Sequence, residues 1–296
     1  MVEISWDQIG QAQWEQLADR ARAPMQQRWA YGETHAALGG SVLRALICQN
    51  DRPVAICQSV SRRVAGLLST SLTTRGPLWL APCDRRRVLK LIRRTSPLPR
   101  PRAHLFTLPD ATPRSTRLIP LMSPATSTQL ALPVTMKSLQ GKWRNALRQA
   151  KNSGLRTRHT PCSAKMLSRL LLTDARQQLD RSYRALPAGF TRKWHQIVAD
   201  DLRLITVGKS EDTIATALFI RHGNTATYHI AHNTDTGRLL SAGRLALWRA
   251  FTDFTKQGIA EIDLGIIDTE NAPGLARFKL GTGAIAQRLG PTVLAI

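Results

Sequence analysis

The alternation of apolar and polar residues is clearest in the last quarter of the chain. It predicts a strand at 225–233, an amphipathic helix at 239–257, a second strand at 260–265 and a short helix at 274–281. A strand that leads into a helix N-terminus, with a parallel strand beside it, forms a cleft where the helix begins. We therefore expect the chemistry of the protein in this segment.

Two stretches of the chain repeat one order of elements. Residues 42–56 read as strand, polar turn and strand, and residues 201–215 repeat that plan. Each is followed by a further strand, a helix and a strand, at 66–74, 85–94 and 103–108 in one case and at 225–230, 239–257 and 260–264 in the other. The repetition predicts an α/β fold with mixed sheets and two related domains, residues 1–160 and 161–296.

Positive charge is in large excess and is unevenly distributed. The chain has 42 Lys and Arg against 20 Asp and Glu, a formal net charge of +22. This excess predicts a polyanionic partner, although an arginine-rich composition from a GC-rich genome gives the same count. Residues 85–94 form a basic amphipathic helix, and residues 137–158 carry no acid. A membrane surface could attract the same patches as a peripheral contact, but neither has an aromatic-rich apolar face.

Several classes of protein are disfavoured. Apolar runs are too short to cross a bilayer, and the uncharged stretch 118–136 is interrupted by three prolines. No secretory signal is visible, and the four cysteines lie far apart with no CxxC spacing, so we expect a cytoplasmic protein without disulfides or zinc. His229 and His232 are not spaced with acids as metal ligands are, so no metal site is expected.

Three segments resemble the Fem-type transferases. Residues 139–155 (LQGKWRNALRQAKNSGL) resemble a helix of that family, and residues 26–33 (QQRWAYGE) resemble its N-terminal aromatic segment. Residues 258–265 followed by 274–283 resemble its ending of strand-Asp, loop and Phe-Lys. The chain departs from the family at Tyr31 and Glu33, where the cell-wall enzymes have a lysine. A nucleotide-sugar or lipid diphosphate acceptor is therefore not implied.

The resemblance implies two tandem GNAT-type domains and N-acyl transfer. Fem proteins use aminoacyl-tRNA, and their broader relatives use acyl-CoA; either would be a co-substrate, with no tightly bound cofactor. Three function hypotheses follow: transfer of an aminoacyl group from charged tRNA to an acceptor amine, acyl-CoA-dependent transfer, and a non-catalytic GNAT-like protein that binds a polyanion. Acyl transfer of this type needs backbone donors where two parallel strands diverge, and no hydrolase triad.

The catalytic candidates are Lys279, Asp263 and Tyr228, the first of them by resemblance. Lys279 matches the lysine of the Phe-Lys motif and would hold a phosphate or stabilise the oxyanion, unless it is a solvated helix lysine. Asp263, at the end of a buried strand, would take the proton of the amine or orient the acceptor, unless it caps the next loop. Tyr228 would face the cleft, unless it is a core tyrosine; alternation places it on one face with Ile230 and puts His229 on the other.

Donor and acceptor residues come from two further motifs. Residues 238–243 (RLLSAG) partly match the pyrophosphate loop of acyl-CoA-dependent GNAT enzymes, which makes Arg238, Ser241 and Gly243 candidate donor-binding residues. Gly243 could equally serve the packing of the helix on the sheet. Candidate substrate-binding residues are Trp29 and Tyr31 on the acceptor side, where packing is the alternative, and Arg144 and Arg148 for the tRNA backbone.

Overall fold

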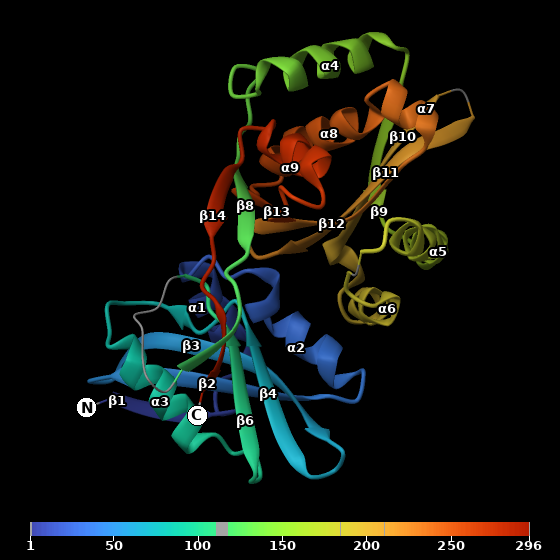
Figure 1. The fold of residues 1–296 in the computed structure, drawn as a ribbon. Coiled ribbons are helices and arrows are strands. Elements are labelled where there is room, and N and C mark those ends of the chain that lie inside the picture. Colours follow the sequence, from blue (N-terminus) through green and yellow to red (C-terminus); the bar gives the residue numbers. More distant parts are fainter. Residues whose placement is uncertain (1, 111–117, 184, 210, 296) are drawn as a thin grey trace. The chain divides into compact units, whose positions relative to one another are not determined.

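The computed structural model describes residues 2–110, 118–183, 185–209 and 211–295 (Figure 1). Its chain forms two compact units, Met1–Ala125 with Arg288–Ile296, and Thr126–Gln287. We expected a boundary after residue 160. The structure differs because strands far apart in the sequence pair with one another, which local periodicity does not reveal.

The first unit is built on one mixed sheet. Its elements are β1 (Val2–Trp6), α1 (Gln11–Arg20), a 3₁₀ turn (Met25–Gln27), α2 (Trp29–Ala36), β2 (Ser41–Gln49), β3 (Arg52–Val64), β4 (Leu68–Thr74), β5 (Leu78–Trp79), α3 (Arg85–Thr95), β6 (Arg102–Thr107), β7 (Leu118–Met122) and β15 (Thr292–Ala295). In the described residues the strand order is β1-β2-β3-β4-β6-β15-β7, with β5 paired to β3. The Asp84 side chain caps α3 by accepting a hydrogen bond from the backbone N–H of Arg87.

The second unit repeats this plan. Its elements are β8 (Thr126–Ala131), α4 (Gly141–Asn152), β9 (Arg156–Pro161), α5 (Ala164–Asp180), α6 (Ala188–Ile197), a 3₁₀ turn (Ala199–Asp201), β10 (Leu202–Lys209), β11 (Asp212–His222), β12 (Thr225–Asn233), α7 (Asp235–Leu239), α8 (Ala242–Lys256), β13 (Glu261–Ile267), α9 (Pro273–Leu280) and β14 (Ile285–Arg288). The described strands follow the order β14-β8-β13-β12-β11-β10-β9. Helix α8 covers one face of the sheet, and α5 and α6 cover the other (Figure 1).

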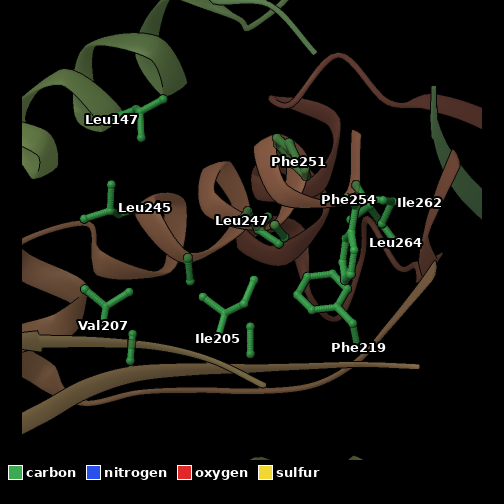
Figure 2. Close-up of a cluster of buried hydrophobic side chains, with 14 of the residues drawn as sticks. Leu147, Ile205, Val207, Phe219, Leu245, Leu247, Phe251, Phe254, Ile262 and Leu264 are labelled. Carbon is green, nitrogen blue, oxygen red and sulfur yellow. The ribbon is translucent and has the colours of Figure 1, made fainter. Parts of the chain in front are cut away.

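The core of the second unit lies on both sides of α8. Figure 2 shows Leu147 of α4 pointing towards α8 from one side, and Ile205 and Phe219 of the sheet from the other. Phe254 is fully buried there. Burial of a large apolar side chain stabilises a fold by roughly 1.5–3 kcal/mol. A helix apolar on two sides is thus held firmly, which fixes the position of its N-terminus.

Most predicted elements are present, but two helices begin later than expected. The helix expected from the Fem resemblance of residues 139–155 begins at Gly141, after a turn. The helix expected at 239–257 begins at Ala242, because Ser241 has a left-handed backbone (φ 54°) that separates it from α7. Within the described ranges, every helix is too short or too polar to cross a membrane.

Candidate active site

Two neighbouring parallel strands of the second unit separate partway along their length. β12 and β13 pair at Thr225 with Glu261, Ala226 with Ile262 and Thr227 with Asp263, and no further pair is formed in the described residues. Beyond this point, backbone groups of each strand lose the partner that the other strand supplied. We call the region beyond Thr227 and Asp263 the strand gap.

The expected alternation along β12 is wrong at a bulge. Phe219 of β11 pairs with Tyr228, but the preceding Leu218 pairs with Ile230, so His229 is the extra residue. Residues that pair directly point to the same face, so Tyr228 and Ile230 lie on opposite faces, not on one. The ring of Tyr228 lies 5.4 Å from that of Phe219, and burial raises the pKa of its hydroxyl. The ring is therefore part of the core packing, and a catalytic role for its hydroxyl stays a prediction.

His229, the extra residue of the bulge, contacts helix α6. His229 Nε2 lies 2.8 Å from Thr191 Oγ1 of α6, and burial lowers the pKa of the imidazole to about 4. The ring is thus neutral at physiological pH and tied to α6. The described residues contain no group of three or more His, Cys, Asp or Glu arranged to hold a metal ion.

Asp263 lies in the middle of β13, not at its end. Its Oδ1 accepts a hydrogen bond from the backbone N–H of Gly265 at 2.7 Å and one from Ser127 Oγ at 3.5 Å. Leu264 is bulged out of the pairing with β8, and Gly265 has a left-handed φ of 80°. The carboxylate therefore holds the bend of β13, which agrees with the capping alternative. Proton transfer by Asp263 stays a prediction.

Lys279 is buried and lies beside this bend. The residue is 6% exposed, and its Nζ donates to the carbonyl of Ile266 at 2.8 Å, so it is not a solvated helix lysine. Burial lowers the pKa of Lys279 to about 8, and the charge of Asp263 opposes that effect. The structure thus brings Lys279 and Asp263 together at the strand gap.

Helix α4 fixes the helix that carries Lys279. The indole N–H of Trp143 donates to the carbonyl of Phe278 at 3.0 Å, and a Cβ on Gly281 would lie 2.6 Å from Trp143 Cδ1. Thr282 Oγ1 donates to the carbonyl of Lys279 at 2.6 Å. The sequence gave no sign of this contact, because the partners are 135 residues apart.

The predicted donor loop lies at the start of α8. The backbone N–H groups of Ala242 and Gly243 belong to the first turn of this helix, where no partner within the helix exists. A Cβ on Gly243 would lie 2.9 Å from Asn233 Nδ2, so only glycine fits there without a shift of Asn233. Ser241 Oγ accepts a hydrogen bond from Arg244. The loop can therefore offer backbone donors to an anion, and Gly243 also serves packing.

Arg238 lines a small basic hollow next to this loop. The hollow has a volume of about 350 Å³ and is lined by Thr173, Arg176, Gln177, Asp180, Arg181, His232 and Arg238. Arg238 donates to the carbonyl of Asn233 and forms an ion pair with Asp235 at 2.6 Å. Burial, then the charges of Arg238 and Arg181, lower the pKa of His232. The sequence did not indicate Arg176 or Arg181 as site residues, because they lie in and just after α5, far from the loop in sequence.

Trp29 and Tyr31 belong to the first unit, whereas the candidate residues described above belong to the second. The Arg44 guanidinium lies 3.5 Å above the Trp29 ring, and Arg44 also pairs with Glu33. Tyr31 is buried against His35, with ring centroids 4.7 Å apart, and burial raises its pKa to about 12. Both rings pack within their own unit, and an acceptor-binding role for them stays a prediction.

Arg144 and Arg148 lie on one helix but differ in their surroundings. Arg144 is half-buried, and its Nη1 reaches the carbonyls of Met136 and Leu139 at 3.5 Å each. Arg148 is exposed and bonds only to Asn145 among the described contacts. Arg144 therefore stabilises the turn before α4, and Arg148 is the one presented to solvent.

Comparison with known proteins supports a GNAT-type fold. A family model described as an acetyltransferase (GNAT) domain matches residues 137–280, which include β12, β13 and Lys279. A crystal structure of FemX is similar, with a TM-score of 0.78 at 11% identity, covering 98% of this chain and 96% of that one. A search of curated proteins found no match.

Two further solved structures are similar over nearly their whole length. A conserved protein of unknown function from Bacteroides thetaiotaomicron VPI-5482 has a TM-score of 0.55 at 14% identity, covering 99% of both chains. A tandem GNAT protein from the clavulanic acid biosynthesis pathway has a TM-score of 0.53 at 13% identity, covering 100% of this chain and 98% of that one. The chain therefore has a tandem, Fem-like GNAT fold, and its residues 137–280 match the GNAT acetyltransferase family.

Proposed function

We propose that the protein is an N-acyltransferase that moves an aminoacyl group from charged tRNA to an acceptor amine. The observation that carries the transfer chemistry is the strand gap, which begins beyond Thr227 and Asp263 and has the buried amine of Lys279 beside it. Backbone groups that have lost their strand partner can donate to a carbonyl oxygen as negative charge develops on it.

The reaction forms one C–N bond and breaks one C–O bond. The neutral acceptor amine attacks the ester carbonyl, and the carbonyl electrons move to oxygen to give a tetrahedral intermediate. The C–O bond to the ribose then breaks, its oxygen takes a proton, and the amine nitrogen loses one. In this proposal protonated Lys279 stabilises the oxyanion, and the carboxylate of Asp263 takes the proton of the amine.

The charge of α4 supports a tRNA donor. Lys142, Arg148 and Lys151 are all exposed on this helix, and residues 137–158 contain no acid to oppose them. An exposed basic helix is suited to the phosphate backbone of a nucleic acid. The Fem resemblance implies the same class of donor.

An acyl-CoA donor is the second candidate, and the donor loop favours it. The first-turn amides of α8 and the hollow lined by Arg176, Arg181 and Arg238 suit the phosphates of a nucleotide-type carrier. A 3′-terminal RNA nucleotide also carries a phosphate, so this feature does not separate the two donors.

Mass spectrometry of the products can separate them. The purified protein is incubated with a mixture of amines and either charged tRNA or a panel of acyl-CoA esters, with Lys279→Met as the matched control. Acylated amine formed from charged tRNA alone, and lost in Lys279→Met, is the expected result. Product from acyl-CoA alone would establish the second candidate. No product from either donor would leave a non-catalytic polyanion-binding protein.

A further inference from the structure

A second basic hollow lies in the first unit, at the C-terminal end of α3. Its volume is about 860 Å³. Four arginines line it, Arg93, Arg94, Arg100 and Arg102, together with His104, and none of its described lining residues is acidic. We call it the α3 hollow. It is formed entirely by residues of the first unit, so the strand gap of the second unit takes no part in it.

Arg102 is the structural member of this cluster. Its guanidinium donates to the carbonyls of Arg93 and Arg94 at 3.1 and 2.8 Å, and also to those of Ser96 and Leu98. The carbonyls of Arg93 and Arg94 belong to the last turn of α3, where no partner within the helix exists. Because Arg102 already satisfies them, the neighbouring arginines are not needed to cap the helix.

The other three arginines are available to a ligand. Among the described residues, no ion pair involves Arg93, Arg94 or Arg100. Arg94 and Arg100 are exposed, and Arg93 is half-buried. Burial lowers the pKa of Arg102, and the charges of Arg100 and Arg93 lower it further, so these cations are close enough to repel one another. An anion placed among them would relieve that repulsion.

The floor of the hollow contains a polar atom that has no partner. His104 is 2% exposed, and its Nδ1 lies 2.7 Å from Ser71 Oγ, but its Nε2 has no hydrogen-bond partner among the described residues. The hydroxyl of Ser69 is buried without a partner too, two residues along β4 from Ser71. Leaving such a buried group unpaired is unfavourable. A molecule bound in the hollow could pair with Nε2 of His104, which lines it.

We propose that the α3 hollow binds a phosphate-bearing small molecule, with its phosphate oxygens on Arg93, Arg94 and Arg100 and an uncharged polar part at His104. Guanidinium groups pair with phosphate through two parallel hydrogen bonds, and an acid-free lining leaves that pairing unopposed. The volume lies in the range of small-molecule sites and exceeds what a lone phosphate ion fills. A nucleoside diphosphate has both the charge and the size.

Calorimetric titration with ADP and with pyrophosphate, at constant ionic strength, tests this site. Arg94→Gln and Arg100→Gln are each expected to weaken the binding of both ligands by roughly tenfold or more, since each variant loses a hydrogen bond between charged groups. Arg86→Gln is the matched control, because Arg86 is exposed on the same helix, loses the same charge and does not line the hollow. Its affinity should stay within about twofold of wild type.

A second variant reports on the floor of the hollow. His104→Phe keeps a ring of similar size and removes Nε2, so ADP should bind more weakly while pyrophosphate is unaffected. If this variant fails to fold, Arg94→Gln and Arg100→Gln still test whether the hollow binds the phosphate group. Equal weakening by Arg86→Gln, or unchanged binding in Arg94→Gln and Arg100→Gln, would overturn the proposal. The proposal would also be overturned if the protein bound RNA or anionic vesicles but did not bind ADP or pyrophosphate.

Discussion

Thr227 and Asp263 are the last residues of β12 and β13 that pair with each other, whereas the corresponding strands of the first unit remain paired throughout. There β4 and β6 run in register from Ser69 with Arg102 to Thr74 with Thr107. Both units thus share one order of elements, but the parallel strand pair separates only in the second unit. In the proposed function, acyl transfer therefore takes place in the second unit, because a closed strand pair has no free backbone donors.

Gly265 offers a test of the strand gap with an internal control. Gly265 and Gly258 have nearly the same left-handed backbone, φ 80° and 77°, so alanine at either should cost about 1–2 kcal/mol of folding free energy. A Cβ at Gly265 would lie 3.6 Å from Lys279 Nζ, but one at Gly258 meets nothing within 4 Å. We expect similar losses in urea unfolding and a loss of transfer rate in Gly265→Ala alone. Equal rates in both variants would contradict this.

Lys279 should give the reaction a falling pH profile. Burial lowers the pKa of its amine to about 8, and the proposed oxyanion role needs the protonated form. The transfer rate should therefore decrease as pH rises through about 8. Lys279→Arg stays protonated and should lose this decrease, whatever its absolute rate. A rate that increases through pH 8 in the wild type but not in Lys279→Arg would show that the neutral amine of Lys279 acts instead, as a base.

Lys279 should also make the free energy of unfolding increase with pH, whereas the transfer rate decreases. Its pKa is about 8 in the folded protein and 10.5 as the ordinary value, so the unfolded chain binds more protons between these two pH values. The free energy of unfolding should therefore increase from pH 8 to pH 10.5, by roughly 3 kcal/mol. Lys279→Met should abolish this increase. Urea unfolding at several pH values measures it, and an unchanged slope would mean that another group is responsible.

Substitution of Ser241 can distinguish donor binding by backbone amides from donor binding by the serine hydroxyl. Its φ of 54° is unfavourable for serine, so Ser241→Gly should raise stability by about 1 kcal/mol. If amides bind the donor, the KM for the donor should not change. Gly243→Ala, whose Cβ would press on Asn233, should raise that KM. A rise in KM for Ser241→Gly would instead show that the hydroxyl contacts the donor.

Arg148 and Arg144 should respond differently in tRNA binding. Filter binding over a salt series should give a slope that becomes shallower by roughly 0.7–0.9 in Arg148→Gln, because one phosphate contact is lost. Arg144→Gln should mainly lower thermal stability, since that side chain holds the turn at Met136 and Leu139. A slope near zero in the wild type would argue against a tRNA donor.

The sequence predicted the elements well and their long-range partners poorly. Residues 225–233 form β12 with the expected bounds, because local alternation specifies a strand. Periodicity could not show that β8 pairs with β13, which is what moves the boundary between the units from residue 160 to residue 125. It also missed β15, a strand of four residues, too short to show a period.

The candidate site was predicted in part. Lys279 and Asp263 do lie together, because the motif resemblance carries that geometry. The prediction that Ile230 shares a face with Tyr228 was wrong, because a bulge adds one residue to β12 and no local signal in the sequence marks it. Contacts such as that between Trp143 and Phe278 depend on tertiary packing, and no pattern within one helix contains them.

Strand β15 imposes an order on biosynthesis. It pairs with both β6 and β7, yet the ribosome must first translate the whole of the second unit before residues 292–295 emerge. Until then the nascent first unit carries an unpaired edge at β6, the kind of surface on which chains associate wrongly. The inserted unit can finish folding while its host waits, so the sheet of the first unit is completed only after the second unit has been made.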